Sequence, residues 1–110
     1  MKGDYPSFSR SYSHEELIEH FLMDEEERQF ISQLRGDANR HGAAILLKSI
    51  KYLGYFPGSL SEIPAVVKLY IAKQMDLAKD LSMHYPWDSR TRGDHLAWIR
   101  QQTGFRFPQA

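Results

Sequence analysis

Residues 35–54 carry the strongest helix pattern in the chain, and they constrain what the rest of it can fold into. Asp37 can cap a first turn with its carboxylate, and Gly54, ahead of Pro57, can end a helix. A rotation of about 100° per residue separates two faces. The apolar face holds Ala43, Leu46, Ile50 and Leu53, and the opposite face holds Arg40, His41, Lys48, Lys51 and Tyr55. We therefore predict a helix between its cap residue Asp37 and its end at Gly54, with one face on a core and a cationic face outward.

Two predicted helices place arginines in the first turn. Arg40 lies near the start of the helix over residues 37–53, and Arg90 and Arg92 begin a helix predicted from residue 88 or 89 to 103. The helix macrodipole disfavours a cation there by roughly 0.3–1 kcal/mol. A solvated surface is the ordinary explanation for one such face. The placement of arginines in the first turn of two helices in one small chain, however, indicates that two helix N-termini face the same anionic partner.

The charged residues are divided unevenly along the chain. The net charge is zero, from 14 basic and 14 acidic residues, which alone argues against nucleic-acid binding. Residues 1–34, however, hold 3 basic and 8 acidic residues, so that residues 35–110 hold 11 basic and 6 acidic ones. The first part carries −5 and the second +5, an asymmetry that is typical of a surface that binds a polyanion.

Local patterns divide the remaining residues into further helices. Ser13-x-x-Glu16 and Asp24-x-x-Glu27 are capping boxes, each of which begins a helix. The expected helices are a short one after Ser13, one after Asp24 to about residue 35, and segments 37–53, 61–75, 77–84 and 88–103, the last ended by Gly104. Strand-like alternation is absent. We predict an all-α fold, a compact bundle of about six short helices with a helix-turn-helix-like arrangement.

The chain length fits a single domain. We expect a flexible arm over residues 1–12, one all-helical domain over 13–107 and a tail over 108–110. The polar start lacks the apolar run of a signal peptide, and no stretch reaches transmembrane length, so we expect a cytoplasmic protein without a membrane partner. The chain has no cysteine, which excludes disulfides and thiolate metal sites.

Three residues near the last predicted helix invite a specific interpretation. Tyr85 and Trp87 flank Pro86, where we favour a hydrophobic plug at a helix junction over a stacking platform for bases. Gly93 lies within the first turn and lowers its helix propensity. We expect it to permit the close approach of a backbone, from a neighbouring helix or from a ligand.

Several short motifs follow one another in a fixed order and spacing. They are Glu15-Glu16-Leu17 to Phe21, Arg35-Gly36-Asp37-x-Asn39-Arg40-x-Gly42, Tyr52-x-Gly54-x-Phe56, Pro64 to Gln74-x-x-Leu77, and Arg90-Thr91-Arg92-x-x-His95-Leu96-x-x-Ile99-Arg100 with Gly104-Phe105. Together they resemble the N-terminal domain of transposases of the Tn-three family, the replicative enzymes of class II bacterial transposons. The resemblance covers roughly residues 13–107.

This resemblance implies a DNA-binding domain that holds the terminal inverted repeats of a transposon, with double-stranded DNA as its partner. In the family, strand transfer belongs to a carboxylate triad and a divalent metal such as Mg far downstream, so the resemblance implies a domain that is non-catalytic and needs no cofactor. Self-association with other transposase domains is also expected.

The candidate DNA-binding residues come from the resemblance and from the cationic helix faces. By position in the motifs they are Arg35, Asn39, Arg40, Arg90, Arg92 and His95, to which Lys48, Lys51 and Arg100 are added. For Asn39 two roles stay open. It can pair with an adenine edge, or, as we prefer, form a buried polar bond that fixes a helix junction.

Two other classes of function were weighed against DNA binding. A helical protein-interaction or assembly module would use the acidic front of the chain to meet partners. An enzyme is disfavoured, because the five histidines show no metal-ligand spacing and no nucleophile-elbow sequence occurs.

Overall fold

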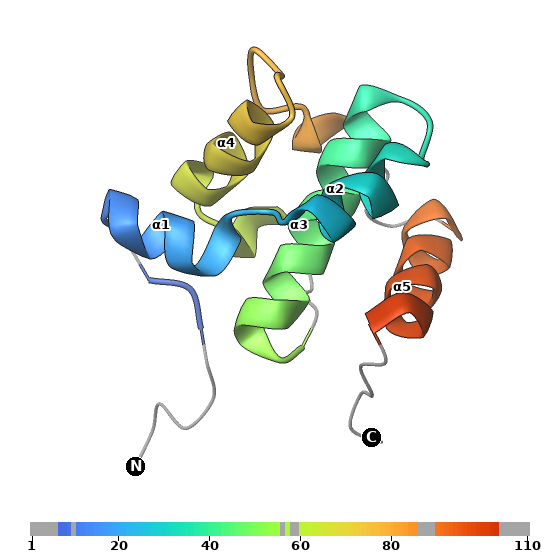
Figure 1. Ribbon diagram of the computed structural model, residues 1–110, viewed down its shortest axis with the longest axis horizontal. Helices are drawn as coiled ribbons and strands as arrows, with labels where there is room; N and C mark the ends of the chain where they lie inside the picture. The colour runs from blue at the N-terminus through green and yellow to red at the C-terminus, as the bar shows by residue number, and fades with distance from the viewer. Residues whose placement is uncertain (1–6, 10, 56, 58–59, 86–89, 104–110) are drawn as a thin grey trace.

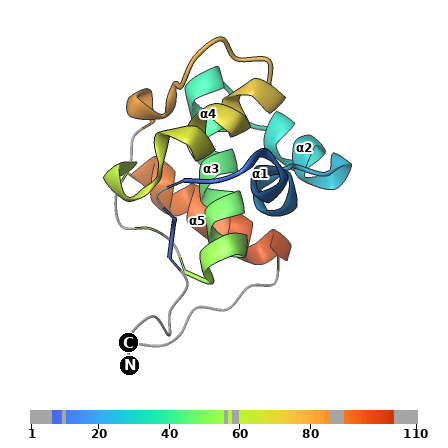
Figure 2. The same ribbon diagram turned by 90° about the vertical axis from the view of Figure 1, so that its left-hand side faces the viewer.

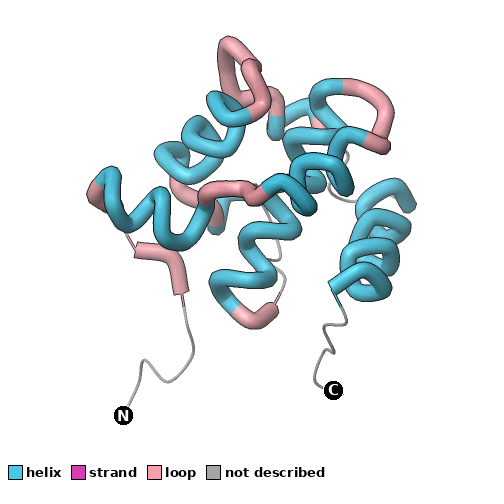
Figure 3. The backbone as a smooth tube through the Cα atoms, in the orientation of Figure 1, coloured by secondary structure: helices cyan, strands magenta, loops and turns pink. Residues whose placement is uncertain are grey.

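The computed structural model describes residues 7–9, 11–55, 57, 60–85 and 90–103 (Figure 1). It contains the α-helices α1 (His14–Phe21), α2 (Glu25–Ser32), α3 (Asp37–Leu53), α4 (Ala65–Gln74) and α5 (Arg90–Thr103), and the short 3-10 helices η1 (Leu60–Glu62) and η2 (Ser82–His84). Figure 3 shows only helices and loops in these ranges. The predicted all-α class is confirmed. None of the described helices has the length and hydropathy needed to cross a membrane.

The helix α3 is the centre of the molecule and packs against α1, α2, α4, α5 and η2 (Figure 2). Every residue from 41 to 50 is buried. The predicted cationic outward face is therefore wrong, since it included His41 and Lys48. The physical reason is that neighbouring elements cover this helix on all sides, and at Gly42 the fit is so close that an added β-carbon would collide with the ring of Tyr85.

The two ends of α3 differ in how well they match the sequence pattern. Gly54 ends the helix in the left-handed conformation, with φ of 85°, as predicted. The predicted cap at Asp37 is wrong, because Gly36 is the N-cap residue and no side chain caps this end. Asp37 is instead the first helical residue, and its carboxylate pairs with Arg40.

The capping boxes predicted at the starts of α1 and α2 are both present. Ser13 Oγ accepts from the Glu16 N–H at 3.1 Å, and Asp24 Oδ1 accepts from the Glu27 N–H at 2.8 Å. The helix α2 is shorter than predicted and ends at Ser32.

The predicted helix over residues 77–84 is absent except for η2, so that the bundle has five α-helices rather than six among the described residues. The chain leaves α4 at Asp76, which has φ of 60°. Further on, the N–H of Leu81 donates to His41 Nδ1 at 3.1 Å, and the N–H of Ser82 donates to Asp80 Oδ1 at 2.8 Å. Side chains thus take backbone donors that a helix would use.

The connection between α2 and α3 is as short as the turn of a helix-turn-helix motif. Residues 33–36 form a short turn that ends at Gly36, with φ of 87°. In that motif the second helix enters a DNA groove. Residues 41–50 of α3 are buried, so that at its N-terminal end only the first turn, residues 37–40, is accessible, and the helix-turn-helix-like arrangement stays a prediction.

Some predictions lie outside the described residues. They concern Trp87, the helix start at residue 88 or 89, the helix end at Gly104 and the tail over residues 108–110. In the predicted arm, Phe8 is described and stacks on Tyr52, with ring centroids 5.6 Å apart.

Candidate nucleic-acid interface

One side of α5 is anchored to the body of the domain. Ile99 is fully buried, and the Trp98 ring stacks on Phe30 of α2 with centroids 3.4 Å apart and an interplanar angle of 27°. Arg92 Nη2 donates to the carbonyl oxygen of Pro57 at 2.8 Å. These contacts hold the helix in one orientation and determine which of its residues face outward.

The other side of α5 is exposed and follows the helical repeat. Its exposed residues, among those with a described side chain, are Arg90, Gly93, Asp94, Ala97, Arg100 and Gln101. A β-carbon added at Gly93 would meet no heavy atom within 4 Å, so the expected close approach of a neighbouring helix is wrong for the described residues. The result is an outward face with an arginine near each end and two small residues and one carboxylate, Asp94, between them.

The exposed acidic residues of α1 lie away from this face. Figure 1 shows α1 and α5 on opposite sides of α3 along the longest axis. The exposed acids of α1 and of the start of α2 are Glu15, Glu16, Glu19, Asp24, Glu25 and Glu26. The first turn of α5, in contrast, holds no acidic residue. The exposed acids of α1 are thus separated in space from the two exposed arginines of α5.

The turn before α3 presents one exposed cation and uses two other candidates internally. Arg35 is exposed, and its carbonyl oxygen accepts from Asn39 Nδ2 at 3.1 Å. This bond lies at the helix junction, as predicted for Asn39, but it is exposed, so the predicted burial is wrong. Arg40 Nη1 donates to the Leu34 carbonyl at 2.7 Å, and its Nη2 pairs with Asp37. The predicted conflict between Arg40 and the helix dipole is therefore resolved by a carboxylate of the same chain.

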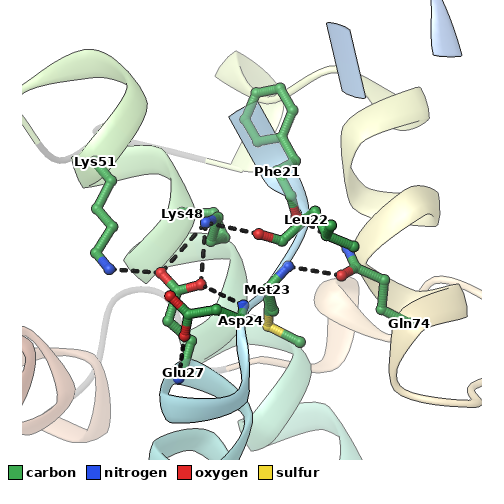
Figure 4. A network of polar contacts seen from close by, with 8 residues as sticks. All are labelled: Phe21, Leu22, Met23, Asp24, Glu27, Lys48, Lys51 and Gln74. Carbon is green, nitrogen blue, oxygen red and sulfur yellow. Dashed lines mark hydrogen bonds and ion pairs between the residues drawn. The ribbon is translucent and has the colours of Figure 1, made fainter. Parts of the chain in front are cut away.

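Lys48 and Lys51 both bind Glu27, as Figure 4 shows. Lys48 Nζ lies 3.2 Å from each carboxylate oxygen of Glu27 and donates to the Leu22 carbonyl at 3.1 Å. Burial alone would raise the pKa of Glu27. The hydrogen bonds from Lys51 and the Asp24 N–H, together with the charge of Lys48, outweigh it and lower the pKa below its ordinary value.

The expectation that Lys48 is an outward cation is wrong, since the residue is only 7% exposed. Lys51 keeps 43% of its side chain exposed although it is paired. The sequence offers little indication of this arrangement, because Glu27 also fits the ordinary first-turn role of an acid in α2. The lysines that bind Glu27, Lys48 and Lys51, lie more than twenty residues further along the chain.

His95 belongs to an internal pair rather than to the exposed face. Its Nδ1 and the Oη of Tyr85 lie 2.6 Å apart in a hydrogen bond, and the two rings also stack. Burial lowers the pKa of His95, while the nearby Asp94 opposes that shift. Tyr85 is 3% exposed, which confirms the predicted plug for this residue.

The described residues contain no group of three histidine, aspartate or glutamate side chains that could hold a metal ion.

Comparison with known proteins identifies the family. A family described as a domain of unknown function (DUF4158) matches residues 2–109. The chain belongs to this family. The DUF4158 match extends over nearly the whole sequence and includes α1 to α5.

Curated relatives of this DUF4158 domain are transposases. The transposase for transposon Tn501 of Pseudomonas aeruginosa is 35% identical over 80% of this chain and 9% of the relative. The transposase for transposon gamma-delta of Escherichia coli (strain K12) is 28% identical over 96% of this chain and 11% of the relative. The transposase for transposon Tn1546 of Enterococcus faecium is 30% identical over 78% of this chain and 9% of the relative. These matches confirm the predicted relationship to Tn-three family transposases, and the chain spans about a tenth of each relative.

Proposed function

We propose that this DUF4158 domain binds double-stranded DNA through the exposed face of α5 and supplies binding rather than chemistry to a transposase. The observation that carries the proposal is the outward face of α5, where Arg90 and Arg100 flank the small residues Gly93 and Ala97 and outnumber the one exposed acid of this face, Asp94. Arginine neutralises phosphates, and small side chains let a helix backbone approach the bases.

The dimensions of this face fit a DNA groove. Arg90 and Arg100 are ten residues apart, which at about 1.5 Å per residue separates them by about 15 Å along the helix. The major groove of B-DNA is about 12 Å wide. In the proposed arrangement the two arginines reach phosphates on either side of the groove, and Gln101 lies where a side-chain amide can meet a base edge.

Other candidates take supporting roles in the proposal. Arg92, through the Pro57 carbonyl, and His95, through Tyr85, hold α5 in place. Arg35 adds an exposed cation after α2, the helix whose Phe30 stacks on α5. Asn39 and Arg40 shape that turn. Lys48 takes no part, since its ammonium is buried against Glu27.

The acidic surface of α1 supports the choice of α5. Negative side chains repel a phosphate backbone, so that DNA approaching this domain is directed to the opposite side. By similarity to the transposase relatives, we propose the terminal inverted repeats of a transposon as the bound DNA.

The test is fluorescence anisotropy of a labelled duplex that carries a transposon end, beside a scrambled duplex of equal length. Tighter binding of the end duplex supports end recognition. Equal binding of both reduces the role to holding phosphates. Absence of binding at low salt contradicts the proposal for this domain.

A further inference from the structure

The outward face of α5 carries a negative charge between its two arginines. Asp94 is exposed, and so are Ala97 one turn later and Gln101 two turns later along the same side of the helix. A carboxylate on a face that meets DNA is repelled by the phosphates. Such a residue weakens binding to every duplex except one that offers its oxygens a hydrogen-bond donor.

The ordinary structural roles of an acid in a helix do not account for Asp94. The helix macrodipole favours acids in the first turn, and its effect falls off beyond that turn. The first turn of α5 holds no acid, and Asp94 follows it. Arg90 precedes Asp94 by four residues, a spacing that permits an ion pair. Among the described residues, however, Asp94 forms no ion pair with Arg90 or with any other cation.

The four bases differ in the groups that they present in the major groove. Cytosine presents its N4 amine, which donates hydrogen bonds. Guanine presents two acceptors, adenine presents an acceptor beside its amine, and thymine presents an acceptor beside its methyl group. An ionised carboxylate only accepts hydrogen bonds. Asp94 therefore fits cytosine, and its charge disfavours the acceptors of the other three bases.

The surroundings of Asp94 allow so short a side chain to reach a base. An aspartate carboxylate meets a base edge only when the helix backbone comes close to the DNA. Gly93 precedes Asp94, and a β-carbon added there would meet no heavy atom within 4 Å. Ala97 is exposed three residues further on, where it adjoins Asp94 on the helix surface. These two small residues leave space for a base beside the carboxylate.

We propose that Asp94 is a specificity-determining residue, which accepts a hydrogen bond from the N4 amine of a cytosine in the major groove. This inference rests on the DNA binding proposed above for α5, in which Arg90 and Arg100 reach the phosphates. The two arginines supply affinity for any duplex, and Asp94 restricts tight binding to duplexes that place a cytosine at one position.

Selection from a pool of duplexes with a randomised central segment tests the proposal, with sequencing of the bound fraction. The wild type should select a C·G pair at one position, and Asp94→Ala should lose that preference alone. Asp94→Asn should change the preference to an A·T pair, because a side-chain amide fits the N6 and N7 atoms of adenine. The matched control is Glu15→Ala, which removes an exposed acid of α1 and should keep the wild-type preference. Because both side chains are exposed, circular dichroism should show the variants folded.

Fluorescence anisotropy on single duplexes from the selected pool gives the size of the effect. Replacing the C·G pair by T·A should weaken binding of the wild type by about tenfold and that of Asp94→Ala by less than about twofold. Asp94→Ala should also bind unselected duplexes more tightly than the wild type does, because a charge that repels phosphates is removed.

The possible results distinguish the role of Asp94 from DNA binding by α5. A wild type that retains no duplex at low salt contradicts the DNA binding, and the role of Asp94 with it. A wild type that binds duplexes without a preference for cytosine would overturn the role of Asp94 and leave the phosphate contacts of α5 in place. An Asp94→Ala variant that keeps the wild-type preference would overturn it in the same way.

Discussion

The ammonium of Lys48 on α3 lies 3.2 Å from both carboxylate oxygens of Glu27 on α2, inside the domain. Lys48 and Glu27 are 7% and 5% exposed. The same ammonium donates to the Leu22 carbonyl, so that one side chain joins α3 to the start of α2 and to the connection from α1 (Figure 4). We assign this pair to the stability of the fold rather than to DNA contact.

Replacing Lys48 by alanine should therefore destabilise the domain. Removal of Lys48 leaves the buried Glu27 carboxylate with only the partly exposed Lys51 as its counterion, and it leaves the Leu22 carbonyl without this donor. The loss should therefore approach but not exceed the roughly 3–5 kcal/mol that is typical of a buried ion pair broken at one partner. Urea denaturation followed by circular dichroism measures the loss. Lys51→Ala should cost less, since Lys51 is partly exposed and Lys48 still neutralises Glu27. Equal stabilities of Lys48→Ala and Lys51→Ala would contradict this assignment.

The two glycines Gly42 and Gly93 should respond in opposite ways to alanine. At Gly42 the added methyl group collides with the Tyr85 ring, and overpacking of this kind typically costs about 1–3 kcal/mol. At Gly93 the methyl group meets open space, and the higher helix propensity of alanine should stabilise the domain by about 0.5–1 kcal/mol. Thermal unfolding of both variants checks the pair, and a Gly42→Ala variant as stable as Gly93→Ala would refute the close contact with Tyr85.

Stability should fall in mildly acidic solution because of His41. Its Nδ1 accepts from the Leu81 N–H at 3.1 Å, so its Nε2 carries the proton that is donated to the Lys68 carbonyl at 2.9 Å. Burial lowers the pKa of His41, which the Lys68 carbonyl bond and the Asp80 charge oppose only in part. A lowered folded-state pKa means that the stabilisation is present above the unfolded value of about 6.5 and is lost as the pH falls through the folded value.

The measurement is the free energy of unfolding at about pH 7.5 and about pH 5.5, on either side of the ordinary histidine pKa. The wild type should be less stable at the lower pH, and His41→Gln should reduce the difference between the two. The control is His84→Gln, whose side chain is exposed and should leave the difference unchanged. A His41→Gln variant with the full wild-type difference would show that other groups cause it.

The existence of the helices was predictable because their signals are local. The Ser13 to Glu16 capping box and the left-handed Gly54 each act within one helical turn. The faces of α3 were not predictable from periodicity. Small residues at 42–44 admit neighbours on every side, and the acid that neutralises Lys48 comes from another helix.

The same distinction holds for the loop after α4 and for the candidate site. No local pattern indicates that the N–H of Leu81 donates to His41. This hydrogen bond is one reason why a loop and η2 are present where a helix was predicted. The sequence indicated arginines at two helix starts. The structure separates Arg90, which is exposed, from Arg40, which binds Asp37 and Leu34.

The most direct test of the central claim is the salt dependence of duplex binding for the wild type and for the Arg90→Ala/Arg100→Ala double variant, with Lys79→Ala as an exposed-cation control. Each lost phosphate contact lowers the slope of log K against log salt by about 0.9. The double variant should bind more weakly, with a slope smaller by about 1.8, while the control keeps the wild-type slope. An unchanged affinity and slope in the double variant would contradict the assignment of DNA binding to α5.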